Sequence, residues 1–201
     1  MELPNRQQAL ELLHQYTTKD GLIKHALAVE AAVRAYARRH GEDEEVWGLV
    51  ALLHDFDYER WPSPEDHPFR GAEILEQKGY PEWFRRAILS HADYSGIPRE
   101  TVLEKTLYAC DELSGFVTAC SLVMPGKSIH ALKAKSVRKR LKAKAFAASV
   151  NRDDIARGAE ELGVELDEHI AFVIEALRGI APQLGLDGDG QGGGEIESKR
   201  E

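Results

Sequence analysis

The spacing of apolar residues is helical along most of the chain. Apolar side chains recur three and four residues apart, and no stretch of useful length shows the period of two that marks a half-buried strand. The pattern therefore predicts an all-α fold. We expect helices near residues 5–17, 22–40, 43–55, 67–78, 82–91, 99–123, 129–145, 152–162 and 167–181.

A single domain, residues 1–182, accounts for most of the sequence. A chain of 201 residues with 43% hydrophobic residues can bury one sizeable core. We expect the centre of this domain at about 20–120 and a basic helical part at about 125–182. From Gln183 the sequence "QLGLDGDGQGGGEIESKRE" is rich in glycine with little to bury, so we expect 183–201 to be a disordered tail.

The sequence argues against a membrane protein. Its first residues, "MELPNRQQALELLHQY", lack the basic and apolar regions of a signal peptide, and no apolar run approaches the ~20 residues that span a bilayer. We therefore expect a cytoplasmic protein. Cys110 and Cys120 lie ten residues apart in one expected helix, which fits neither a disulfide framework nor a CxxC metal site, so we expect both to fill the core.

The stretch "LVALLHDFDYERW", residues 49–61, places two polar residues at the end of an apolar run. His54 and Asp55 directly follow the mostly apolar residues Val46–Leu53. Burying an imidazole and a carboxylate without partners costs several kcal/mol. These two side chains therefore need a partner from elsewhere in the fold.

Four further residues of the same kinds point toward the interior. His25 and His91 share helix faces with apolar residues one turn away, and Asp111 lies in an otherwise apolar helix. His67 opens an expected helix directly after Asp66. A single inward histidine or aspartate is more often a hydrogen-bonded core residue or a helix cap. Six such residues in one small domain are more than these structural roles readily explain.

The remaining histidines fit ordinary structural roles. His40, at the end of an expected helix, complements the helix dipole. His14 and His169 occupy positions that we expect on helix surfaces. His130 lies in the basic part of the chain and fits either description.

The six inward residues form a set of nitrogen and oxygen ligands. Imidazole and carboxylate without thiolate suit Mn, Fe, Co, Ni or Zn, and the set is richer in nitrogen than Mg usually accepts. His54 and Asp55 diverge by about 100° around a helix axis, but both can reach one site beyond the helix end. Because a carboxylate can bridge two ions, Asp55 is the natural bridging ligand if two ions bind.

The order of these residues resembles the HD-domain superfamily (HDIG-type) of metal-dependent phosphohydrolases, an all-α helical bundle with its metal in the helical core. The resemblance covers roughly 20–120 and lies in "HALAVEAAVRAYA", "VALLHDFDYE", "HPFRGAEIL", "AILSHADYSG" and "LYACDELSGF". It implies a first metal held by His25, His54, Asp55 and Asp111, and a second held by His67 and His91 as in the binuclear branch. After the His-Asp pair this chain has Phe56-Asp57, where many relatives carry Ile-Gly.

The resemblance also implies two reaction classes. Most members hydrolyse phosphate esters or anhydrides of nucleotides, whereas a smaller binuclear branch are diiron oxygenases resembling myo-inositol oxygenase. The first class implies hydrolysis of a phosphomonoester, phosphodiester or phosphoanhydride bond of a small nucleotide-like substrate by metal-activated water, with Asp55 and His54 as catalytic residues. The alternative is an oxygenase acting on a small polyol or phosphonate.

The distribution of charge favours the hydrolase. A net charge of −8 argues against generic binding to nucleic acid. From Leu113 to Arg152 the chain has nine basic residues and no acidic residue, so the remainder carries −17. Such a basic segment beside an acidic metal site favours an anionic phosphate substrate. We expect phosphate contacts from Lys24, Arg70, Lys133 and Arg138.

Two other interpretations of the basic segment stay open. The first is a nucleic-acid surface on a binding module with a structural metal, although Phe146 is the only aromatic residue near the basic run and stacking on single strands would be weak. The second is a homodimer interface or regulatory lid formed by the helices after residue 125.

Overall fold

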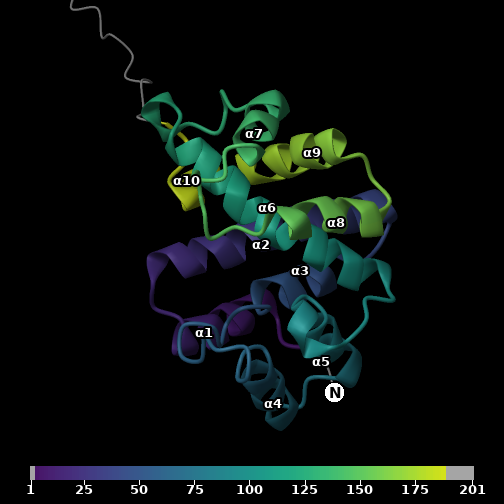
Figure 1. The fold of residues 1–201 in the computed structure, drawn as a ribbon. Coiled ribbons are helices and arrows are strands. Elements are labelled where there is room, and N and C mark those ends of the chain that lie inside the picture. The colour runs from purple at the N-terminus through teal and green to yellow at the C-terminus, as the bar shows by residue number, and fades with distance from the viewer. Residues whose placement is uncertain (1–2, 189–201) are drawn as a thin grey trace, which may run out of the picture.

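The computed structural model describes residues 3–188 and confirms the all-α prediction (Figure 1). Within this range the chain forms helices and turns and no β-strand. The helices are α1 (Arg6–Tyr16), α2 (Asp20–His40), α3 (Glu44–Leu52), α4 (Phe69–Gln77), α5 (Glu82–Leu89), α6 (Val102–Leu122), α7 (Ala134–Leu141), α8 (Arg152–Leu162), α9 (Leu166–Arg178) and α10 (Ala181–Leu184). Short 3-10 turns lie at Asp93–Ser95 and Pro125–Lys127.

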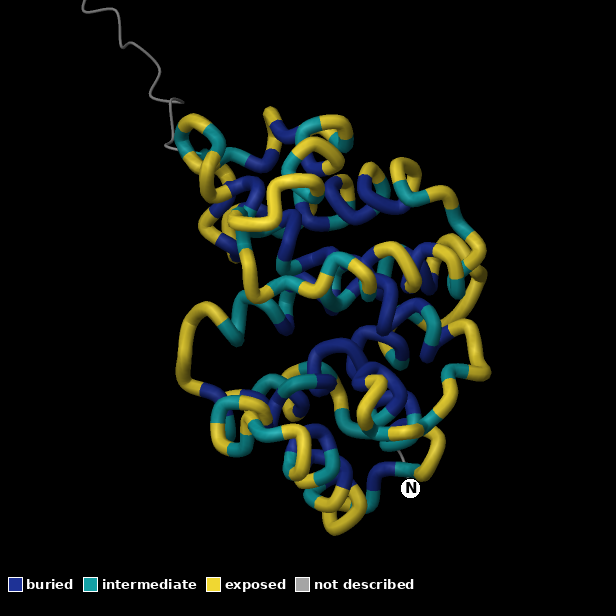
Figure 2. Tube along the Cα trace, viewed as in Figure 1, coloured by how far each residue is buried: buried dark blue, intermediate teal, exposed yellow. Residues whose placement is uncertain are grey.

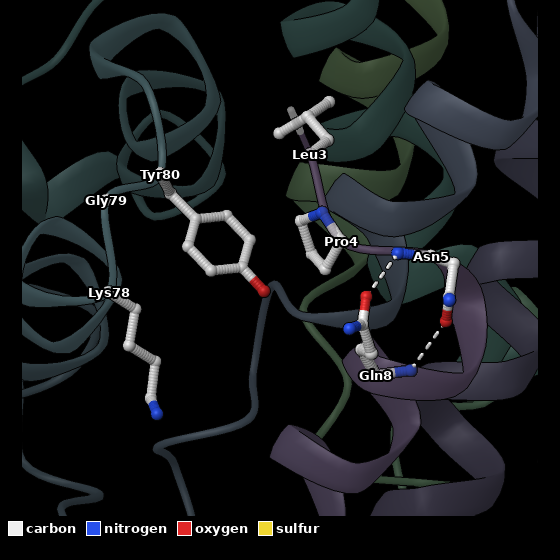
Figure 3. Close-up of a pocket in the computed structure, with 7 residues that line it drawn as sticks. All are labelled: Leu3, Pro4, Asn5, Gln8, Lys78, Gly79 and Tyr80. Carbon is white, nitrogen blue, oxygen red and sulfur yellow. Dashed lines mark hydrogen bonds between the residues drawn. The ribbon is translucent and has the colours of Figure 1, made fainter. Parts of the chain in front are cut away.

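Several helix ends follow from their capping residues. Asn5 and Gln8 form a capping box at the start of α1, in which each side chain accepts a hydrogen bond from the backbone N–H of the other (Figure 3). Thr101 and Glu104 do the same at the start of α6. Gly41 ends α2 in the left-handed conformation, with a φ of 72° that glycine adopts without strain.

The two longest helices, α2 and α6, form the centre of the fold (Figure 1). Helix α3 packs on α2, α8 packs on α6, and α9 packs on both α2 and α6. Figure 2 shows the buried segments along these helices and the exposed ones toward the periphery. The hydrophobic core extends from Ala9 in α1 to Leu186 after α10, with Tyr36 and Phe116 among its largest side chains.

Helix α8 approaches the backbone of α6 at Gly158. A Cβ atom built on Gly158 would lie 2.7 Å from the Cα atom of Ala109, closer than real Cβ contacts. The hydrogen of glycine therefore lets the two helices lie this close together. Ala109 is two residues before Asp111, so this contact fixes the position of α8 relative to the polar part of α6.

The basic part of the chain is less helical than the sequence pattern predicted. The expected helix at 129–145 is reduced to α7, and the chain continues from Lys142 to Asn151 as turns. The guanidinium of Arg152 donates hydrogen bonds to the carbonyl oxygens of Phe146, Ala147 and Val150. These carbonyls are satisfied by one side chain in place of helical N–H groups, which explains why this segment keeps a fixed shape without a helix.

The packed chain extends past the expected boundary at residue 182. Helix α10 includes Gln183 and Leu184, and Leu184 and Leu186 are buried. The apolar residues of "QLGL" thus reach the core, which a count of glycine residues does not detect. Of the expected tail, residues 189–201 lie outside the described residues.

His169 is buried, and its expected position on a helix surface is wrong. Its Nε2–H donates to the carbonyl of Ala109 at 2.9 Å, and the hydroxyl of Tyr36 donates to its Nδ1 at 2.7 Å. Burial lowers the pKa of His169. Helices α2, α6 and α9 are thereby joined by a neutral imidazole whose two nitrogen atoms are both satisfied.

The other histidines and the two cysteines lie in places that agree with the sequence analysis. His14 is exposed, and His40 is the last residue of α2. Cys110 and Cys120 are buried free thiols, as predicted. His130 lies at the surface and pairs with Asp187. Among residues 3–188, no helix combines the length and the hydropathy needed to cross a membrane.

Candidate metal centre

Six side chains from distant parts of the sequence meet near the centre of the fold. Helices α2 and α6 supply one each, and the other four come from residues just outside α3, α4 and α5. The six are His25, His54, Asp55, His67, His91 and Asp111. The structure therefore brings together all the residues that the sequence pattern indicated as ligands.

Two of the imidazole groups lie where helices end. The Nδ1–H of His54 donates to the carbonyl of Ala51 at 2.7 Å, and the Nδ1–H of His91 donates to the carbonyl of Ile88 at 2.6 Å. Carbonyl groups in the last turn of a helix have no helical partner, so these bonds satisfy them and hold the rings. Helices α3 and α5 accordingly end before these histidines, earlier than the apolar pattern predicted.

A first group of ligand atoms comprises His25, His54 and Asp55, whose candidate ligand atoms all lie within 4.8 Å of one another. The Oδ2 atom of Asp55 is 3.8 Å from Nε2 of His25 and 3.5 Å from Nε2 of His54. The Oδ1 atom of Asp111 adjoins the same nitrogen atoms, at 3.0 Å from His25 and 3.4 Å from His54. Two imidazoles and two carboxylates can thus surround one ion.

A second group comprises Asp55, His67 and His91. The Oδ1 atom of Asp55 is 3.2 Å from Nε2 of His67 and 3.2 Å from Nε2 of His91. The two oxygen atoms of Asp55 therefore face different pairs of histidines. This is the arrangement expected of a carboxylate shared between two ions.

The hydrogen bonds decide which ring nitrogen faces inward. Carbonyl oxygens can only accept, so the Nδ1 atoms of His54 and His91 carry protons and each ring directs its Nε2 atom toward Asp55. Lone pairs on nitrogen and on a carboxylate repel each other unless a proton or a metal cation lies between them. The buried Nε2 of His54 has no hydrogen-bond partner among the described residues. A divalent transition metal fits this set of donors.

The electrostatics of the cluster agree with this geometry. Burial opposes a charge on His54, but Asp55 and Asp111 outweigh it and raise the pKa of His54 to about 9. Burial likewise opposes a charge on His67, and the hydrogen bonds to Asp55 and Asp57 raise its pKa to about 9. Burial also opposes the charge on Asp55 and Asp111, yet the neighbouring histidines lower both carboxyl pKa values. The cluster therefore stabilises positive charge at its centre.

Asp57 supports the second group, and the sequence argument gave it no role. Its Oδ1 accepts the Nδ1–H of His67 at 2.8 Å, and its Oδ2 accepts the backbone N–H of Gly71 at 2.8 Å. A Cβ atom on Gly71 would lie 2.9 Å from the carboxyl carbon of Asp57, so the glycine makes room for this carboxylate. The one available signal was the Phe56-Asp57 pair, where many relatives of this type carry Ile-Gly.

A cavity of about 550 Å³ is lined by His25, Asp55, His67, His91 and Asp111, whereas His54 is fully buried. Two tyrosines with exposed rings, Tyr58 and Tyr94, also line the cavity. Another part of its lining comes from the chain after the basic segment, at Ser149–Asn151, Asp154 and Arg157. A different cavity, of about 500 Å³, lies between the start of α1 and the residues before α5 and contains none of the six ligands (Figure 3). The ligand-lined cavity is therefore the candidate functional site.

Glu112 also lines the cavity, beside Asp111. Burial and the charge of Asp111 raise the pKa of Glu112 to about 7. Its Oε2 atom accepts a weak hydrogen bond from the backbone N–H of Asn151 at 3.3 Å. This carboxyl group thus connects α6 with the turn before α8.

The four residues expected to contact phosphate lie outside the lining of this cavity. Lys24 pairs with Asp20 at 2.8 Å, and Arg70 pairs with Asp66 and Glu73. Arg138 pairs with Asp167, and Lys133 directly precedes α7. Of the lining residues that the structure describes, Arg157 alone carries a permanent positive charge. A role of these four residues in binding substrate stays a prediction.

Comparison with known proteins agrees with this geometry. Residues 22–115 match the family model of the HD domain. This match supports membership of the HD-domain superfamily over residues 22–115. No solved structure gave a significant match. The HD-domain match contains all six candidate ligands, whereas Ser149–Asn151, Asp154 and Arg157 lie beyond its end. The HD-domain superfamily consists mostly of metal-dependent hydrolases, and the histidine and aspartate cluster indicates that this member binds a divalent metal.

Proposed function

We propose that the protein is a metal-dependent phosphohydrolase that cleaves a phosphoester or phosphoanhydride bond of a small nucleotide-like substrate. The observation that carries the proposal is the position of Asp55, whose two oxygen atoms face two separate pairs of histidines in a cavity large enough for such a substrate. Membership of a superfamily made up mostly of metal-dependent hydrolases supports the same reaction class.

The proposed ligands divide between two ions. His25, His54, Asp55 and Asp111 would hold the first ion, and Asp55, His67 and His91 would hold the second, with Mn, Fe, Co, Ni or Zn as candidates. A bound ion of this kind lowers the pKa of water toward about 7 and polarises a phosphoryl oxygen.

The protein's own contribution is to hold these groups in place before the substrate arrives. The bonds from His54 to Ala51 and from His91 to Ile88 fix both rings with Nε2 directed inward. His54 is buried, so bulk water is kept away from it. Electrostatic interactions between His54 and the neighbouring carboxylates are therefore stronger than they would be in water. In this proposal Asp55 faces the cavity, and His54 holds the first ion from its buried side.

A panel of substrates tests this proposal. Nucleotides, phosphomonoesters and polyols are incubated with Mn, Fe and Co, in air and under nitrogen. A phosphohydrolase releases phosphate or a nucleoside monophosphate equally well without oxygen, because hydrolysis needs no change of metal oxidation state. His54→Ala should abolish the activity, and His14→Ala, which changes an exposed histidine, should not. A product that forms only with iron and consumes oxygen contradicts the proposal and identifies a diiron oxygenase.

A further inference from the structure

The cavity has two parts with different charge. The inner part contains the proposed ligands, and the outer part comes from α6, the 3-10 turn after α5, and the chain around the start of α8. The outer carboxylates are Asp93, Glu112 and Asp154. From this difference we propose that the cavity selects a phosphate monoester, with a single phosphoryl group, over di- and triphosphates. The rest of the selected substrate carries hydroxyl or ammonium groups that donate hydrogen bonds. This inference rests on the proposed function.

The inner part suits one dianionic group. Two divalent ions held there would bring four positive charges, against two negative charges from the ligands Asp55 and Asp111. The inner part then has a surplus of two positive charges, which a single phosphoryl group balances. A second phosphoryl group would have to lie against the outer part of the cavity.

The outer part does not attract a second phosphoryl group. Its one guanidinium, Arg157, already pairs with Asp93 and Asp154 and donates to the hydroxyl of Tyr108 at 2.7 Å. The positive charge of Arg157 is therefore compensated before any substrate binds. The carboxylates outnumber it, so like charges would face the oxygen atoms of a di- or triphosphate.

The outer carboxylates offer acceptors to the rest of the substrate. The described hydrogen bonds reach Oδ1 of Asp154 and Oε2 of Glu112, and none among residues 3–188 reaches Oδ2 of Asp154 or Oε1 of Glu112. Hydroxyl or ammonium groups donate to such oxygen atoms, whereas phosphate oxygens cannot.

This outer part is held rigidly enough to discriminate. The guanidinium of Arg99 lies 3.6 Å above the ring of Tyr108 and pairs with Asp93 and Glu161. Tyr108 in turn donates to Asp154 at 2.9 Å. The carboxylates therefore cannot readily turn away from an unfavourable anion.

Binding and turnover of one nucleoside series test the inference. Adenosine mono-, di- and triphosphate are titrated calorimetrically into Mn-loaded protein at fixed free Mn, and hydrolysis of each is measured in parallel. We expect the monophosphate to bind more tightly than the triphosphate by roughly tenfold or more, from repulsion between charges a few ångströms apart. Equal or tighter binding of the triphosphate overturns the inference.

Two variants identify the source of the discrimination. Asp154→Asn removes a full outer negative charge, so the ratio of monophosphate to triphosphate affinity should fall by about fivefold. Glu112→Gln removes a carboxyl group whose pKa is about 7, so the same ratio should fall by a smaller factor. Asp153→Asn is the matched control, because Asp153 is exposed in the same helical turn and does not line the cavity. An unchanged ratio in both variants overturns the inference. Failure to hydrolyse any phosphate compound, with the ranking of affinities intact, contradicts the proposed function alone.

Discussion

Asp57 and His67 form a buried carboxylate–imidazole pair with an Oδ1 to Nδ1 distance of 2.8 Å, on the side of the ring opposite Asp55. The bond fixes the proton on Nδ1 and leaves Nε2 of His67 free for a metal. Paired carboxylates of this kind both orient a ligand and increase its basicity. Asp57 should therefore control the second ion without touching it.

Replacing Asp57 by asparagine tests this relationship. Asp57→Asn keeps the size of the side chain but removes the charge, and we expect the affinity of the second ion to fall by about 10- to 100-fold. Calorimetric titration of the metal-free protein resolves the two binding events. The control is Asp66→Asn, since Asp66 adjoins His67 in sequence but pairs with Arg70 near the surface. An equal loss of affinity for both ions would show that Asp57 acts only on the fold.

Removing one ligand from the second group should change the number of bound ions. His67→Ala or His91→Ala is expected to lower the metal content from two ions per chain toward one while the helical circular dichroism persists. Asp55→Ala should reduce binding at both sites, because its two oxygen atoms face both histidine pairs. Elemental analysis of the purified variants measures the content. Two ions retained in both histidine variants would contradict the second site.

The metal-free protein should lose stability as the pH rises from about 6.5 to 9. The pKa of His54 and that of His67 are raised to about 9, so their protonated forms stabilise the fold below pH 6.5 and this contribution is lost as the pH passes through 9. A bound metal replaces these protons, so the loss should be absent in loaded protein. Thermal unfolding at pH 6 to 9.5, with chelator or with Mn, measures both curves. Parallel curves would contradict the role of the two histidines.

The buried bond between Tyr36 and His169 should contribute to stability. Tyr36→Phe leaves the buried Nδ1 of His169 without its donor, which costs about 1–3 kcal/mol. Chemical unfolding at pH 7.5 measures this loss. Tyr16→Phe is the comparison, because no hydrogen bond to the Tyr16 hydroxyl occurs among the described residues and the expected change is within about 0.5 kcal/mol. Similar losses in the two variants would contradict a specific role for the bond.

The sequence predicted the architecture and the inner part of the cavity better than its outer part. Helical periodicity sufficed for the all-α fold, and polar residues on apolar helices indicated the cluster of His25, His54 and Asp111. Periodicity could not show that α3 and α5 end before their histidines, because the bonds from the rings to backbone carbonyls are made only in three dimensions.

The outer part of the cavity could not be predicted for a different reason. A basic run indicates a charged surface but not which way that surface faces, so the pattern indicated Lys133 and Arg138 and gave no role to Arg157. Arg157 follows a segment of turns whose shape depends on hydrogen bonds donated by Arg152. No local sequence pattern predicts such a segment. His169 was misplaced because its buried partners, Tyr36 and Ala109, are far away in sequence.

The close contact of Gly158 with Ala109 separates shape from charge in this cavity. The distance between α6 and α8 is set by backbone atoms, while the outer charges belong to side chains that project from those helices. Substitutions at Glu112 and Asp154 therefore alter electrostatic preference at constant width. A change at Gly158 would instead alter the size of molecule admitted, so steric and electrostatic selectivity can be redesigned independently.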